Sequence, residues 1–172
     1  MADYEKTFEN ELKKIEKVLN SLIKKYKLPP DYFDNLKDTL KHLFDLYRTN
    51  INKILNICLA FERGEITDIS QINLKEILNE SEKIELAADS MLTITNQKFL
   101  IIELEFEKKW RNAYRLLNWH LYRLWQISKH FKHEVVSATK ENKLKECIEK
   151  LIEAHNYLIN MLDTLESEKI KI

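Results

Sequence analysis

The fold is decided by residues 36–61, which read LKDTLKHLFDLYRTNINKILNICLAF. Apolar side chains recur along this stretch at every third or fourth position: Leu36, Leu40, Leu43, Tyr47, Ile51, Ile54, Cys58 and Phe61. That spacing places them on one side of a helix and predicts a buried helix over about residues 32–62. Gly64 follows, as expected for the left-handed residue that often ends a helix. Asn50 interrupts the apolar seam and either fixes helix register or faces solvent.

The same periodicity predicts further helices over about residues 4–27, 71–93, 97–137 and 140–167. Pro29 and Pro30 end the first of these, and Asp68 or Ser70 is expected to cap the helix that begins near residue 71. Residues 93–96 weaken a helix, so residues 71–137 form either one kinked rod or two packed helices. The expected fold is all-α: one domain over residues 1–172, a bundle of four to five long amphipathic helices, mostly antiparallel, with room for a helical overhang.

Composition excludes several functional classes. With a single glycine, the chain has no phosphate-binding loop and no dinucleotide-binding fingerprint, and no cofactor is expected. The net charge of zero gives no strong global field, and no apolar run approaches the length of a membrane span. The polar N-terminus is unlike a secretory signal, so we expect a cytoplasmic protein. Cys58 and Cys147 lie on apolar stripes, as small buried hydrophobes would, although a disulfide stays open.

Charge is nevertheless segregated along the chain. Residues 62–107 carry 11 acids and 4 bases, whereas residues 108–133 carry 7 bases and no acid. All three tryptophans lie in the basic stretch. On a helical wheel, one side of this stretch is apolar and is expected to face the core: Trp110, Tyr114, Leu117, Leu121, Leu124 and Phe131.

The opposite side of the stretch is basic and aromatic. Arginine and lysine side chains there suit phosphates, and aromatic rings suit unstacked bases, so we expect RNA or single-stranded nucleic acid as the partner. The candidate binding residues are Lys108, Arg111, Arg115, Trp119, Tyr122, Arg123, Lys129 and His133. In the alternative interpretation, the acidic helix upstream packs against this face and neutralises it.

Two short motifs offer chemistry. Residues 115–120 read RLLNWH and have the R-x4-H form. This motif resembles the catalytic motif of the HEPN family, helical bundles that include metal-independent ribonucleases and toxins. The resemblance covers six residues and implies that His120 is the general acid and base and that Arg115 stabilises the transition state. His130, His133 and Glu134 have a spacing faintly similar to that of hemerythrin-like proteins, but partner ligands on other helices are missing, so no metal is expected.

The sequence therefore favours a non-enzymatic binding or assembly protein, such as a nucleoprotein or capsid-type subunit, that forms homo-oligomers or joins a larger complex. The alternatives are a HEPN-like ribonuclease or toxin and a purely structural homo-oligomeric bundle.

Overall fold

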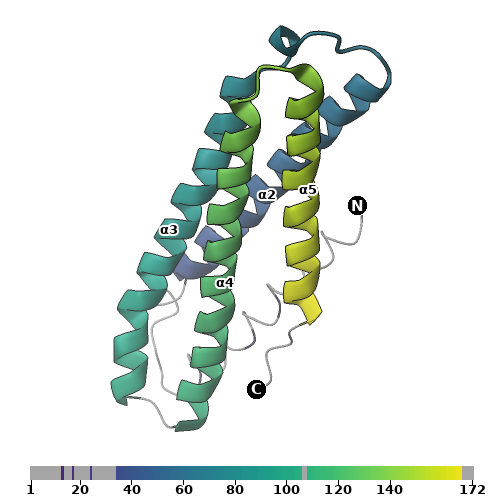
Figure 1. Ribbon diagram of the computed structural model, residues 1–172. Helices are drawn as coiled ribbons and strands as arrows, with labels where there is room; N and C mark the ends of the chain where they lie inside the picture. The colour runs from purple at the N-terminus through teal and green to yellow at the C-terminus, as the bar shows by residue number, and fades with distance from the viewer. Residues whose placement is uncertain (1–12, 14–16, 18–23, 25–33, 106–107, 168–172) are drawn as a thin grey trace.

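A computed structural model describes the backbone of residues 34–105 and 108–167, together with residues 13, 17 and 24. Within the two long ranges, it describes the side chains of residues 38–94, 118–119, 121–162 and 164. Over these residues the chain is all-α, as predicted, and has no strand. The helices are α2 (Asp34–Glu62), a short 3-10 helix η2 (Ile69–Gln71), α3 (Leu74–Glu105), α4 (Lys108–Thr139) and α5 (Leu144–Ser167) (Figure 1).

Four long helices, rather than four to five, pack against each other in this part of the chain. The helix expected over residues 4–27 lies outside the described residues, apart from isolated helical positions. The mostly antiparallel order stays a prediction for the bundle as a whole. The ends of α3 and α4 nearest Glu105 and Lys108 extend beyond the described ends of α2 and α5 (Figure 1).

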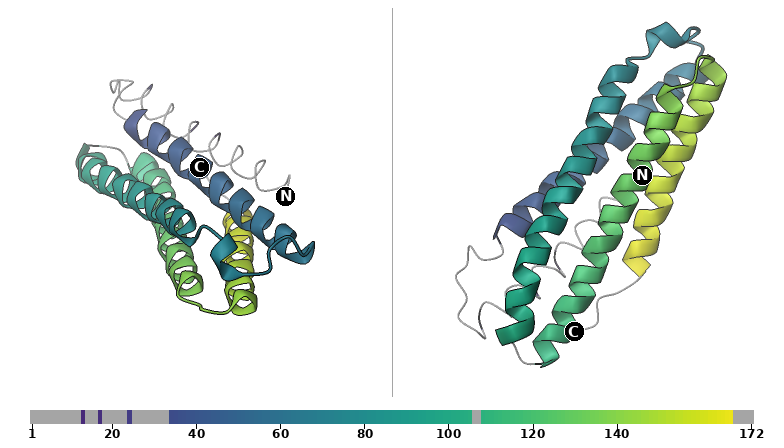
Figure 2. Two further views of the ribbon diagram at one scale, coloured as in Figure 1. Left: turned by 90° about the horizontal axis from the view of Figure 1, so that it is seen from above. Right: turned by 60° about the vertical axis from the view of Figure 1, so that its left-hand side comes forward.

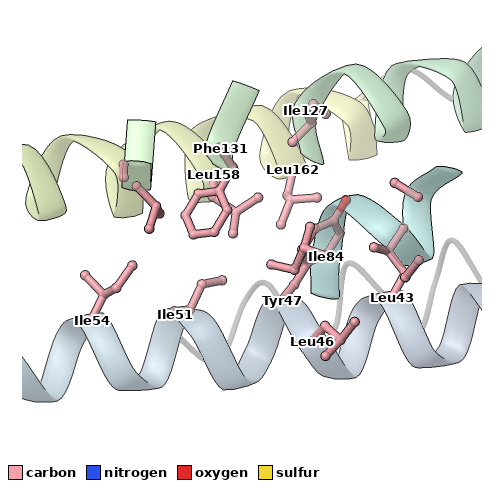
Figure 3. Packing of buried hydrophobic residues seen from close by; sticks show 14 of the residues in the cluster. Leu43, Leu46, Tyr47, Ile51, Ile54, Ile84, Ile127, Phe131, Leu158 and Leu162 are labelled. Carbon is pink, nitrogen blue, oxygen red and sulfur yellow. The ribbon is translucent and has the colours of Figure 1, made fainter. Parts of the chain in front are cut away.

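Among the described helices, each packs mainly on two others. Helix α2 packs on α3 and α5, and α4 packs on the same two helices from the other side. Figure 2 shows α2 crossing the other three helices obliquely. The core fills the space between them, where Tyr47 and Ile51 of α2 meet Phe131 of α4 and Leu158 of α5 (Figure 3). Burying an apolar side chain of this size contributes about 1.5–3 kcal/mol.

Polar groups inside the core are hydrogen-bonded. The Tyr47 hydroxyl contacts Ser128 Oγ, and Ser128 Oγ donates to the Leu124 carbonyl at 2.8 Å. Complete burial raises the pKa of Tyr47 well above its usual value. Asn50 is buried rather than solvent-facing, and its amide donates to the Leu46 carbonyl on α2 and to the Glu80 carbonyl on α3. These bonds join α2 to α4 and to α3 at fixed positions.

The cysteines carry no disulfide. Cys147 on α5 is fully buried, and Cys58 on α2 is half-buried against the core. Burial raises the pKa of both thiols, that of Cys58 to about 11. Both side chains therefore act as small hydrophobes, as their place on the apolar stripes predicts.

Helix ends follow local capping chemistry. Helix α2 ends at Glu62, as predicted, and Gly64 takes the left-handed conformation at φ 75°. The predicted start of the next helix near residue 71 is wrong: α3 begins at Leu74, because Asn73 Oδ1 accepts the Glu76 backbone N–H at 3.1 Å. Asp68, one of the two expected caps, precedes η2 instead.

The predicted interruption at residues 93–96 is also absent. Helix α3 continues through these residues to Glu105, and α4 begins at Lys108 as a separate helix beside it. The Thr93 hydroxyl donates to the Asp89 carbonyl within the helix at 2.9 Å. The β-branched residue therefore satisfies its polar group without breaking α3.

Candidate nucleic-acid interface

Helix α4 has the two sides that the helical wheel predicts. Leu121, Leu124 and Phe131 are buried in the core. On the opposite side, Trp119 is 49% exposed and Tyr122 is 43% exposed. The predictions for Trp110, Tyr114 and Leu117 concern side chains outside the described residues, although their backbone lies in α4.

The edge of α4 that faces α3 is neutralised in its C-terminal half. Trp125 Nε1 donates to Asp89 Oδ1 at 2.7 Å, and Lys129 Nζ lies 3.3 Å from the same oxygen. Glu85 pairs with Lys129 at 3.8 Å and with Lys132 at 3.7 Å. The alternative in which the acidic helix covers the basic face therefore holds at Lys129, one of the candidate binding residues.

The exposed part of α4 lies closer to its N-terminus. The Arg123 guanidinium lies 5.1 Å from the centre of the Trp119 ring, within the range of a cation–π contact. The Tyr122 ring stacks on Trp125, with centroids 5.4 Å apart. We call Trp119, Tyr122 and Arg123 the aromatic–arginine surface. It combines two exposed rings with a permanent positive charge.

The neighbouring part of α3 carries no acid. Residues later in α4 pair with residues earlier in α3: Trp125 contacts Asp89, and Lys132 contacts Glu85. The turns of α4 with Trp119 and Tyr122 therefore lie alongside the part of α3 that follows Asp89. Residues 90–102 of α3 contain one lysine and no carboxylate. The aromatic–arginine surface is thus beyond the acids that pair with the C-terminal half.

The edge of α4 that faces α5 holds a second cluster of rings. The His130 ring lies 4.3 Å from the Tyr157 ring of α5, centroid to centroid, and His130 Nε2 lies 2.9 Å from Glu134 Oε1. Burial and the Glu134 charge raise the pKa of Tyr157, while the Arg123 charge lowers it. Arg123 therefore lies over Trp119 and its charge also acts on Tyr157. The helical wheel of residues 108–133 could not predict a role for Tyr157, because Tyr157 lies on another helix.

The structure describes the side chain of only one of the remaining candidate residues. His133 is exposed on α4. The side chains of Lys108, Arg111, Arg115 and His120 lie outside the described residues. The HEPN-like pairing of Arg115 with His120 therefore stays a prediction.

The described residues provide neither a metal-binding cluster nor a membrane-spanning helix. In the described part of the chain, no cluster of three or more histidine, cysteine or acidic side chains is placed to hold a metal ion. None of the helices described has both the length and the apolar character that crossing a bilayer requires. Comparison of the chain with protein-family models, with curated proteins and with solved structures finds no match.

Proposed function

We propose that this chain is a non-enzymatic binding protein that holds RNA or another single-stranded nucleic acid along the N-terminal half of α4. The observation that carries the proposal is the aromatic–arginine surface, where Trp119 and Tyr122 are each nearly half exposed and Arg123 lies against the indole. Exposed apolar side chains that gather in one patch, unlike scattered ones, are typical of a surface that binds a partner. Stacking a base on such a ring contributes about 1–3 kcal/mol, whatever the base.

The charge of α4 supports the same partner. Positions 108, 111 and 115 are basic and lie within about 80° of arc, on the same side of α4 as positions 119 and 122. No acid occurs in α4 before Glu134 or in residues 90–102 of α3. A phosphate backbone following this side of α4 meets positive charge, with rings beside it for the bases. A duplex offers no unstacked base for the rings, so a single strand is the better ligand.

The experiment measures binding of a labelled single strand of about eight nucleotides, either oligouridylate or oligodeoxythymidylate, between about 0.05 and 0.2 M salt. We expect Trp119→Ala to weaken binding by about 1–3 kcal/mol without changing the salt slope. Arg123→Gln is expected to reduce the slope by about 0.7. The matched control is Arg63→Gln, which makes the same charge change at an exposed position after α2. Equal affinities for the wild type, Trp119→Ala and Arg123→Gln would refute the proposal.

A structural role accounts better for the C-terminal half of α4. Asp89 and Glu85 contact Trp125, Lys129 and Lys132, so these three side chains hold α4 to α3. Charge reversal at Lys132 is therefore expected to lower stability more than nucleic-acid affinity.

Assembly into a homo-oligomer or a larger particle belongs to the same proposal. It draws its support from the length of the helices and from Leu86, an apolar side chain that is 66% exposed on α3. The molecular mass in solution, measured with and without the oligonucleotide, tests it. A monomer under both conditions contradicts the oligomer.

A further inference from the structure

We infer that the bound strand crosses from α4 towards α5, where His130 and Tyr157 form a second position for stacking a base. This inference rests on the proposed function and adds the path of the bound strand. The single-stranded nucleic acid stacks first on Trp119 and then crosses the edge between α4 and α5. It does not follow the α3 edge of α4.

The rings and the cation form a row. Positions 119, 123 and 130 fall within about 40° of arc on α4, because steps of four and seven residues return to the same side of a helix. Arg123 lies over Trp119 and acts electrostatically on Tyr157, and Tyr157 in turn packs on His130. The side chain of His130 is half exposed, which leaves part of this ring pair open to solvent. The row thus consists of the Trp119 ring, the Arg123 cation and the ring pair of His130 and Tyr157.

Charge favours this path over the α3 edge. Along α3, Glu85 and Asp89 border Lys129 and Lys132 and repel a phosphate backbone there. Along α5, residues 154–162 contain no acid and no lysine or arginine. The nearest carboxylate of α4, Glu134, is held against His130 by its Oε1. A strand that leaves Arg123 therefore meets less negative charge towards α5.

The spacing sets the length of strand required. Trp119 and His130 are eleven positions apart on α4, which corresponds to about 16 Å at 1.5 Å per residue. At the stacked spacing of about 3.4 Å per nucleotide, this span takes about five nucleotides. A strand of about three nucleotides reaches only one stacking position, whereas a strand of about eight reaches both.

The experiment compares oligouridylates of about three and eight nucleotides, bound to the full chain at low salt. In the wild type, we expect the longer strand to bind more tightly. Tyr157→Leu, which fills the half-buried site without a ring, and His130→Ala are each expected to weaken the longer strand roughly ten-fold and to leave the shorter one unchanged. Tyr157→Phe, which keeps the ring, is expected to retain wild-type binding of both lengths.

Controls separate this inference from the proposed function. Ile152→Ala changes an exposed apolar side chain of α5 away from the row and is expected to alter neither affinity. Circular dichroism tests whether each variant is folded. If Tyr157→Leu is not folded, His130→Ala tests the second stacking position, because His130 is half exposed. If Trp119→Ala weakens both lengths while the α4–α5 variants weaken neither, or weaken both equally, the second position is wrong and the proposed function stands. If no strand binds the wild type, both are wrong.

Discussion

Replacing Asp89 tests the contacts that hold the C-terminal half of α4 to α3, apart from the half that we propose binds nucleic acid. Its Oδ1 accepts the Trp125 indole N–H at 2.7 Å and lies 3.3 Å from Lys129 Nζ. Asp89→Asn keeps an acceptor oxygen for the indole but removes the charge. A hydrogen bond to a charged group contributes about 1.5–3 kcal/mol and one between neutral groups about 0.5–1.5 kcal/mol. The partly exposed ion pair adds about 0.2–1 kcal/mol.

We therefore expect Asp89→Asn to lower the free energy of unfolding by about 1–2 kcal/mol, because both interactions weaken together. In a chain of this length, each kcal/mol lowers Tm by about 2–4 °C. Urea unfolding and thermal melts measure the loss. Glu82→Gln is the matched control, since it removes an exposed carboxylate from α3 without touching Trp125 or Lys129. Wild-type stability in Asp89→Asn would refute the structural role of this contact.

The same variant has a second readout. Loss of the Asp89 charge releases Lys129 from one of its two carboxylates. Because we infer that the strand leaves over the α4–α5 edge, we expect the affinity and the salt slope of Asp89→Asn to match those of Glu82→Gln. A strand that passed Lys129 would gain one contact, which would steepen the salt slope by about 0.7 and raise affinity about five-fold at 0.1 M salt. A gain of that size would contradict the inferred path.

Three further predictions follow from other parts of the chain. Tyr47 ionises near pH 10 when unfolded, but its raised pKa keeps it protonated in the fold, so stability falls above pH 10 by up to about 1.4 kcal/mol per pH unit. Tyr47→Phe removes this contribution, and urea unfolding at pH 8 and above measures the difference; equal slopes contradict the assignment. Cys58, with a pKa of about 11 against 9.0 for a free thiol, is expected to react with iodoacetamide about 100-fold more slowly at pH 8 than in the urea-unfolded chain. Equal rates would contradict its burial. The HEPN resemblance predicts RNA cleavage in the presence of EDTA, reduced about 10²–10⁴-fold by His120→Ala or Arg115→Ala; intact RNA after incubation with the wild type argues against it.

Helix periodicity was predictable from the sequence, but helix ends were less so. The apolar stripe of residues 36–61 places α2 correctly, since burial of one side needs only the spacing of side chains along a single helix. Two packed helices were one of the two alternatives for residues 71–137, but the position of the break between α3 and α4 was not predictable. No proline, glycine or usual capping residue marks residues 105–108. Residues 93–96 looked like the weaker point, yet the Thr93 hydroxyl bonds within α3, and the packing of α3 on α2 and α4 decides the rest.

The candidate site also has one part that the sequence predicts and one part that it does not. The wheel predicts that Trp119 and Tyr122 lie away from the core, and both are exposed, because orientation around one helix depends only on local spacing. Which carboxylate meets which cation depends on the register between two helices. Periodicity does not encode that register. The sequence therefore left open which basic side chains the acidic helix neutralises, and it gave no reason to link Tyr157 with Arg123.

A chain of zero net charge can still have a positive surface, because salt limits the distance over which one charged side chain neutralises another. At 0.1 M salt the Debye length is about 10 Å. Trp119 and Lys129 are ten positions apart on α4, or about 15 Å. The carboxylates of Glu85 and Asp89 that neutralise Lys129 are therefore largely screened from Trp119. The opposite charges of residues 62–107 and 108–133 therefore hold the C-terminal half of α4 to α3. The N-terminal half of α4, which contains no acid, is the half that we propose binds an anionic partner.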